Sequence, residues 1–173
     1  MAGGLLALAM ALTLAGTAAS PAVAAETLEA AVKATFLYKF IAFVSWPDSA
    51  FPDPSSPFVL CVEGPDPFGE LLDRAVAGQS AAGRPITLWR APRFEAGSGC
   101  HLLYSRSSPG RLRGAPVLTV TDGDSAVDTG AGAVVTFVLR DDRVRFIIDA
   151  AAAQDNHLTI SSKLMSLAVA VRR

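Results

Sequence analysis

The stretch Pro57–Gly69, PFVLCVEGPDPFG, decides how this chain folds. Within it, Phe58–Val62 forms an almost unbroken apolar run. Such a run is typical of a strand covered on both faces, whereas a strand with one wet face alternates apolar and polar side chains. We therefore expect a buried parallel strand here.

A turn and a helix are predicted directly after this strand. Asp66 is a candidate N-cap, and Pro67 can take the first helical position, where its missing N–H group costs nothing. The helix is expected to run to Gly78, a natural left-handed end. Its apolar stripe has helical spacing and consists of Phe68, Leu71, Leu72, Ala75 and Val76. A strand, a tight turn and a helix in this order open a βαβ unit.

Composition indicates one folded domain. The chain has 173 residues, of which 51% are hydrophobic and 18% charged, enough for a sizeable core. The formal net charge is −1 and there is no dense basic run, so nucleic acid is not an expected partner.

Residues 1–25 resemble a secretory signal peptide. Leu5–Leu14 is apolar, and Ala22–Ala25 supplies an A-x-A-like cleavage site, although the segment lacks the usual Lys or Arg. A retained membrane anchor is the weaker alternative, because the apolar part falls short of the ~20 residues that span a bilayer. We expect cleavage near Ala24 or Ala25, export of the mature protein, and a single mature domain of residues 26–173.

Export affects the interpretation of the two cysteines, Cys61 and Cys100. In an oxidising compartment an isolated pair more often forms a disulfide than a metal site or a nucleophile. The alternative is two buried free thiols.

The rest of the chain alternates helices and strands. A long amphipathic helix is predicted over Thr27–Ser45, capped by Thr27 and ended by Trp46 before Pro47. Further strands are expected at Pro85–Arg90 on a sheet edge, His101–Tyr104 and Val117–Thr121, followed by a loop over Asp122–Gly132.

The C-terminal part predicts a β-hairpin and two helices. Ala133–Arg140 and Arg143–Asp149 are apolar runs separated by Asp141-Asp142. Asp149 is expected to cap a helix over Ala150–Asp155 that ends at a left-handed Asn156, and Ser161 to cap a last helix reaching Val171. The whole pattern predicts an α/β three-layer sandwich with a mostly parallel sheet, a C-terminal hairpin and a packed C-terminal helix.

Catalytic residues are sparse. His101 lies in an apolar run and is expected to be a packed residue, His157 is expected at the surface, and no H-x-x-x-H or C-x-x-C spacing exists. Ser161-Ser162-Lys163 lacks the S-x-x-K spacing of a Ser–Lys dyad. We therefore expect neither an enzyme nor a bound metal or cofactor.

Binding residues are more plausible than catalytic ones. Trp46, beside a proline-rich loop, and Phe68 are candidates for contact with a partner, although the spacing of Phe68 also fits the core. Asp66 is a further candidate for contact with a partner, because it lies in the same turn, two residues before Phe68. Asp66 and Asp122 also follow strands, so a small ligand could bind at the carboxyl ends of the sheet.

Several blocks of sequence resemble the YfiR/HmsC-like family of periplasmic proteins. In order they are AVKATFLYKFIAFVSWP, LCVEGPDPFG, GRPITL, CHLLY, VLTVTD and ISSKLMSLA, and they cover nearly all of residues 26–173. The resemblance implies a Rossmann-like sandwich and places Cys61 and Cys100 on the family's structural disulfide. Some relatives carry a second cysteine pair, which this chain lacks.

The resemblance also implies a function. Characterised members repress an inner-membrane diguanylate cyclase through its periplasmic sensor region, which lowers cyclic-di-GMP synthesis and biofilm formation. An OmpA-like outer-membrane lipoprotein can sequester the repressor. We accordingly expect a periplasmic regulatory binding protein, dimeric and without enzymatic activity. The alternative is a periplasmic small-ligand-binding sensor for another membrane receptor.

Overall fold

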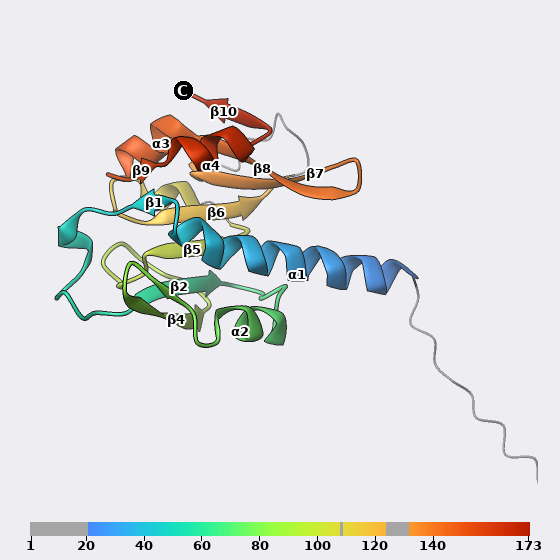
Figure 1. Cartoon of the computed structure of the whole chain (residues 1–173), viewed down its shortest axis with the longest axis horizontal. Helices are drawn as coiled ribbons and strands as arrows, with labels where there is room; N and C mark the ends of the chain where they lie inside the picture. Colours follow the sequence, from blue (N-terminus) through green and yellow to red (C-terminus); the bar gives the residue numbers. More distant parts are fainter. Residues whose placement is uncertain (1–20, 108, 124–131) are drawn as a thin grey trace, which may run out of the picture.

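The computed structural model describes residues 21–107, 109–123 and 132–173. Most of the expected signal peptide and residues 124–131 of the expected loop lie outside these ranges. Within them the chain has an α/β fold centred on an eight-stranded sheet (Figure 1). In spatial order the strands are β10 (Ala170–Arg172), β8 (Arg143–Asp149), β7 (Val135–Arg140), β6 (Leu118–Asp122), β5 (Leu102–Ser105), β2 (Phe58–Glu63), β4 (Arg84–Ala91) and β3 (Ser80–Ala81).

The sheet is mostly parallel, as the sequence predicts. The pairs β10–β8, β2–β4, β2–β5, β5–β6 and β6–β7 are parallel. Antiparallel pairing occurs in the β7–β8 hairpin and between β3 and β4. The hairpin turn Asp141-Asp142 has φ angles of 51° and 55°, the left-handed pair that a two-residue turn requires.

Strand β2 confirms the prediction of a strand covered on both faces. All six of its residues are buried. Phe58, Leu60 and Val62 enter the larger hydrophobic core, whereas Val59 and Cys61 enter a second, smaller one. Alternation along the strand therefore places the two cores on opposite faces of the sheet.

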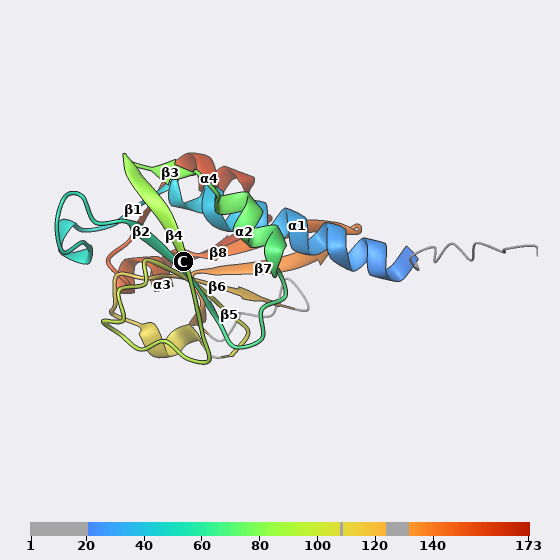
Figure 2. The same cartoon turned by 90° about the horizontal axis from the view of Figure 1, so that it is seen from below.

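The larger core lies under the helices. Helices α1 (Pro21–Ile41), α2 (Glu70–Val76) and α4 (Ser162–Leu167) cover the same face of the sheet (Figure 2). From α1, Phe40 packs on Phe137 and Phe146, with ring centroids 5.8 and 5.1 Å apart. The smaller core lies under the segment 92–101 and the 3₁₀ helix η2 (Pro109–Leu112), and it contains Phe94, Cys100 and Leu112.

Helix α1 begins and ends earlier than predicted. Thr27 is not its N-cap, because the Thr27 hydroxyl lies inside the helix and donates to the Val23 carbonyl. After Ile41 the chain turns, and Val44–Ser45 forms the short strand β1, antiparallel to β9 (Thr159–Ile160). The N-terminal part of α1 extends past the sheet and includes the expected cleavage site near Ala24 or Ala25 (Figure 1). Within the described ranges, no helix has the length and apolarity that crossing a membrane requires.

Helix α2, by contrast, begins later than predicted. Asp66 does not cap it, since Gly69 precedes its first residue, Glu70. Instead the Asp66 carboxylate accepts from the Phe68 N–H at 2.7 Å and closes a local turn. Gly78 has the expected left-handed φ of 68°.

The C-terminal predictions are partly confirmed. Asp149 caps α3 (Ala150–Asp155), accepting from the Ala152 N–H at 2.8 Å, and Ser161 caps α4. The left-handed residue after α3 is His157, with φ of 56°, and not Asn156. The buried Asn156 side chain instead accepts from the Gly114 N–H and donates to the Val117 carbonyl.

Two sheet edges also differ from expectation. The last helix stops at Leu167, and Val171 lies in β10 beside β8. Strand β4 is not outermost, because β3 pairs with its first two residues. Beyond them, the described residues place no strand on the outer side of β4, so the prediction of an edge strand holds for most of its length.

One buried ion pair lies at the carboxyl end of β2. Glu63 is nearly inaccessible, with 3% of its side chain exposed, and pairs with the Arg111 guanidinium. Its carboxylate also accepts from the Phe94 N–H at 2.8 Å and the Ser105 hydroxyl at 2.9 Å. Arg111 donates to the Phe94 carbonyl as well, so this pair fixes the segment after β4 against the sheet.

Candidate functional site

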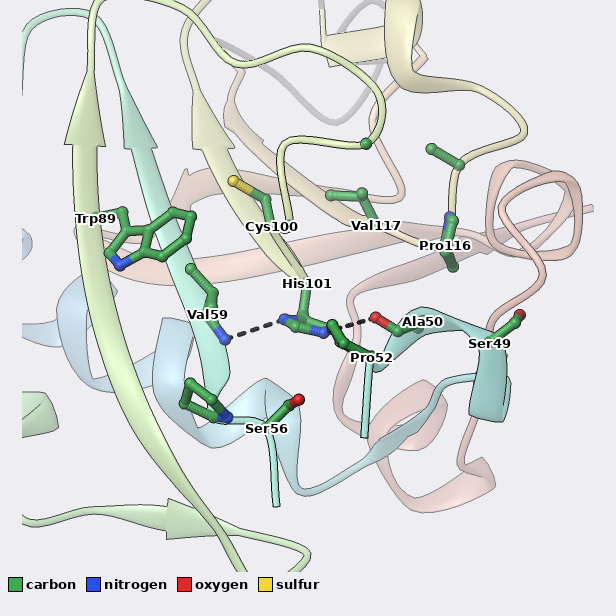
Figure 3. A pocket seen from close by; sticks show the side chains of 14 residues that line it. Ser49, Ala50, Pro52, Ser56, Val59, Trp89, Cys100, His101, Pro116 and Val117 are labelled. Atoms are coloured by element: carbon green, nitrogen blue, oxygen red, sulfur yellow. Dashed lines mark hydrogen bonds between the residues drawn. The ribbon is translucent and has the colours of Figure 1, made fainter. Parts of the chain in front are cut away.

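A cavity lies at the amino ends of β2, β5 and β6. Its volume is about 570 Å³. Figure 3 shows Trp89 on one side of it, Pro116 on the other, and His101 and Val59 between them. Three segments far apart in sequence meet here: the loop before β2, the segment 97–101, and residues 115–117.

Arg84 holds the loop before β2 in place. The Arg84 guanidinium donates to the carbonyl oxygens of Ser56 at 2.7 Å and Asp53 at 3.1 Å. It also lies over the Phe51 ring, 3.9 Å from the centroid, in a cation–π contact. One side chain of β4 therefore fixes a loop whose prolines allow little regular structure.

His101 connects this loop to the sheet. The Val59 N–H donates to His101 Nδ1 at 3.0 Å, so Nδ1 carries no proton, and Nε2–H is left to donate to the Ala50 carbonyl at 3.0 Å. The imidazole stacks on Phe51 with centroids 4.4 Å apart. His101 is thus packed, as the sequence predicts, and its hydrogen bonds show that it is also fully bonded and neutral.

Burial lowers the pKa of His101, and the positive charge of Arg84 lowers it further, although the bond to Ala50 acts in the opposite direction. In the unfolded chain its pKa is about 6.5. At a pH between the lowered pKa of His101 in the folded chain and its pKa in the unfolded chain, the unfolded chain binds a proton that the folded chain does not. The free energy of unfolding is therefore expected to fall as the pH drops through the unfolded pKa toward the lower folded one.

This expectation is testable by urea denaturation between about pH 7.5 and about pH 5.5. His101→Gln should remove most of the loss of stability across this window, whereas His157→Gln, at an exposed position, should keep it. A wild-type protein equally stable at both ends of the window would contradict the assignment.

The disulfide borders the same cavity. Cys61 and Cys100 are bonded, with their Cα atoms 6.0 Å apart. Cys100 lines the cavity, and Cys61 lies in β2 on the side of the smaller core. The bridge therefore fixes the chain just before β5 to strand β2.

A second crevice, of about 410 Å³, lies at the carboxyl ends of the strands, beside α1. Asp122 lines it, as predicted, but Asp66 does not. The Asp122 carboxylate accepts from the Tyr104 hydroxyl at 2.6 Å and pairs with the largely buried Lys33 at 2.8 Å. Burial and this contact with Asp122 raise the pKa of Tyr104. Lys33 also pairs with Glu29, so these charges hold α1 on the sheet.

The three residues expected to contact a partner lie in different surroundings. Trp46 is half-buried, its ring packs edge-on against Phe58 at 4.7 Å, and its N–H donates to the His101 carbonyl at 3.2 Å. Phe68 is 3% exposed and packs against Tyr104, which gives it a place in the core. Asp66 is half-buried and pairs with Arg90 at 2.7 Å. The structure does not bring these residues together in one cavity.

Sequence reasoning missed the cavity at the amino ends. The only local signal for it is the set of prolines in the flanking loops, Pro52, Pro57 and Pro116. Trp89, on strand β4, also lines this cavity. Within the described residues, no group of three or more His, Cys, Asp or Glu side chains is arranged to hold a metal ion.

Comparison with known proteins gives the family. No curated protein matches the chain. The model of the YfiR/HmsC-like family matches residues 30–169, about four-fifths of the sequence, from the middle of α1 to the segment before β10. The chain therefore belongs to the YfiR/HmsC-like family.

Proposed function

We propose that this protein is a periplasmic regulatory protein that represses an inner-membrane diguanylate cyclase by binding the periplasmic region of that enzyme. The family match over residues 30–169 carries the proposal, because this family suggests a regulatory role of the YfiR type. The disulfide supports export, since such bonds persist in oxidising compartments. Residues 1–25 serve as the signal peptide, cleaved near Ala24 or Ala25.

Repression from the periplasm requires a coupling through the membrane. A protein beyond the inner membrane cannot reach a cytoplasmic active site, so it acts by binding one of two receptor states more tightly. No proton transfer or covalent step is needed. A homodimer is the proposed active form, and an OmpA-like outer-membrane lipoprotein that binds the repressor would release the cyclase.

The decisive measurement is cellular cyclic-di-GMP, quantified by mass spectrometry. Deleting this protein should raise cyclic-di-GMP, and a plasmid copy with its signal peptide should lower it again. A copy lacking residues 1–25 should not, because it stays in the cytoplasm. Unchanged cyclic-di-GMP in the deletion strain, with and without envelope stress, would contradict the proposal.

Trp46 is the proposed partner-contact residue, because part of its ring remains at the surface. Trp46→Ala should impair repression, and its denaturation midpoint must be measured in parallel, since the ring also packs on Phe58. His157→Gln, at an exposed position, serves as the control and should repress fully.

The second candidate function is a small-ligand sensor for another membrane receptor. The cavity of about 570 Å³ favours it, since volumes of this order suit small-molecule sites. An unchanged cyclic-di-GMP level in the deletion strain would favour this candidate over repression.

A further inference from the structure

We propose that the cavity at the amino ends of β2, β5 and β6 is a binding site for a small, uncharged aromatic compound bearing a hydroxyl or carbonyl group. The inference goes beyond the proposed function, because such binding does not depend on whether the membrane partner is a cyclase. Three properties of the cavity carry it: its neutrality, its flat apolar walls, and the few polar groups left free to bond.

The cavity wall carries no formal charge. None of its fourteen lining residues is Asp, Glu, Lys or Arg. Its histidine, His101, is held neutral because the Val59 N–H occupies Nδ1. A charged ligand would lose its hydration here and find no counter-charge among the lining residues, which is costly. An uncharged ligand loses little hydration free energy when it enters the cavity.

The walls suit a planar ring. Trp89 is 44% exposed. The other exposed large apolar side chains of the described residues are all aliphatic. The rigid rings of Pro52 and Pro116 form other parts of the wall (Figure 3), and Pro57 lines it as well. Gly99 lies beside the indole, where a Cβ would come within 3.8 Å of the Trp89 ring. An aromatic ligand stacked on this exposed indole would cover apolar surface that water otherwise contacts.

Free polar groups in the cavity are few. Both ring nitrogens of His101 are already hydrogen-bonded to backbone groups. The Ser56 hydroxyl is taken up by Asp53, because it accepts from the Asp53 N–H and also bonds to the Asp53 side chain. Ser49 lies at the exposed edge of the cavity. One hydroxyl or carbonyl on the ligand can therefore be satisfied, whereas a strongly polar molecule cannot.

Isothermal titration calorimetry with three matched naphthalenes tests the ligand class. The probes are 2-naphthol, which is neutral, 2-naphthoate, which is anionic, and 2-naphthylmethylamine, which is cationic at neutral pH. We expect 2-naphthol to bind, and both charged probes to bind more weakly by roughly tenfold or more. Equal affinity for a charged probe, or no binding of 2-naphthol, would overturn the proposal.

Two variants test the location. Trp89→Ala removes the stacking surface, and Ser49→Trp places a large ring at the edge of the cavity without disturbing a buried position. Each should weaken 2-naphthol binding by roughly tenfold or more, while Leu167→Ala, an exposed apolar residue outside the cavity, should not change it. Circular dichroism verifies folding. Wild-type affinity in a folded Ser49→Trp protein and in Trp89→Ala would show that the ligand binds elsewhere.

Discussion

Replacing Cys61 and Cys100 together by alanine is expected to lower the free energy of unfolding by about 4 kcal/mol. The two cysteines are 39 residues apart in sequence, and closing a loop of this length restricts the unfolded chain. Both sulfurs lie in the smaller core, so the folded state also loses buried contacts. Urea denaturation of the purified periplasmic protein, compared with the double variant, measures the effect.

The disulfide itself must be verified in the same preparation. The intact mass before and after reduction and alkylation should show no free thiol in the unreduced protein. Reduced and alkylated wild-type protein should lose stability in the same direction as the double variant. Free alkylation of both thiols without a reductant would contradict the bridge, and a double variant as stable as the wild type would contradict its energetic role.

Elements with strong local signals could be predicted from the sequence. Strand β2 follows from an apolar run that has to be covered on both faces, and the β7–β8 hairpin from two such runs around Asp141-Asp142. The caps Asp149 and Ser161 follow from the side-chain oxygens that suit helix starts. In each case the information lies within about ten residues along the chain.

Short strands could not be predicted in this way. Val44 is buried in the larger core, so its apolar character fits a continued helix as well as strand β1. What decides between them is a distant partner, since Val44 pairs with Ile160 and the Ser161 N–H donates to the Phe43 carbonyl. The same holds for β10, whose pairing with β8 turns the expected end of the last helix into a strand.

The candidate site also has one part that could be predicted from the sequence and one part that could not. The packing of His101 could be inferred because it lies in an apolar run, whereas its neutral state follows from its two backbone partners in the structure. The cavity could not, because it forms where the loop before β2, the segment 97–101 and residues 115–117 meet. The sequence shows such loops only as proline- and glycine-rich connections, and their spatial arrangement depends on long-range contacts such as that of Arg84 with Ser56.

The buried ion pair is the second feature that sequence reasoning missed, and it supports the second large prediction. Arg111→Leu is expected to lower the free energy of unfolding by about 3–5 kcal/mol. Glu63 would remain in the interior with its hydrogen bonds from Phe94 and Ser105 but without the guanidinium that balances its charge. The carboxylate then keeps its desolvation cost without the directly bonded cation that offsets it in the wild type. Urea denaturation near neutral pH measures the loss.

Two further variants separate the buried charge from the lost side chain. Glu63→Gln combined with Arg111→Leu keeps an acceptor for the Phe94 N–H and removes the isolated charge, so it should recover much of the stability lost in Arg111→Leu. Arg74→Leu breaks an exposed pair with Glu70 and should cost at most about 1 kcal/mol. If Arg111→Leu lowers the free energy of unfolding no more than Arg74→Leu does, the Glu63–Arg111 pair contributes only as much as a surface contact. If the double variant is as unstable as Arg111→Leu, packing of the arginine and not its charge holds this part of the fold together.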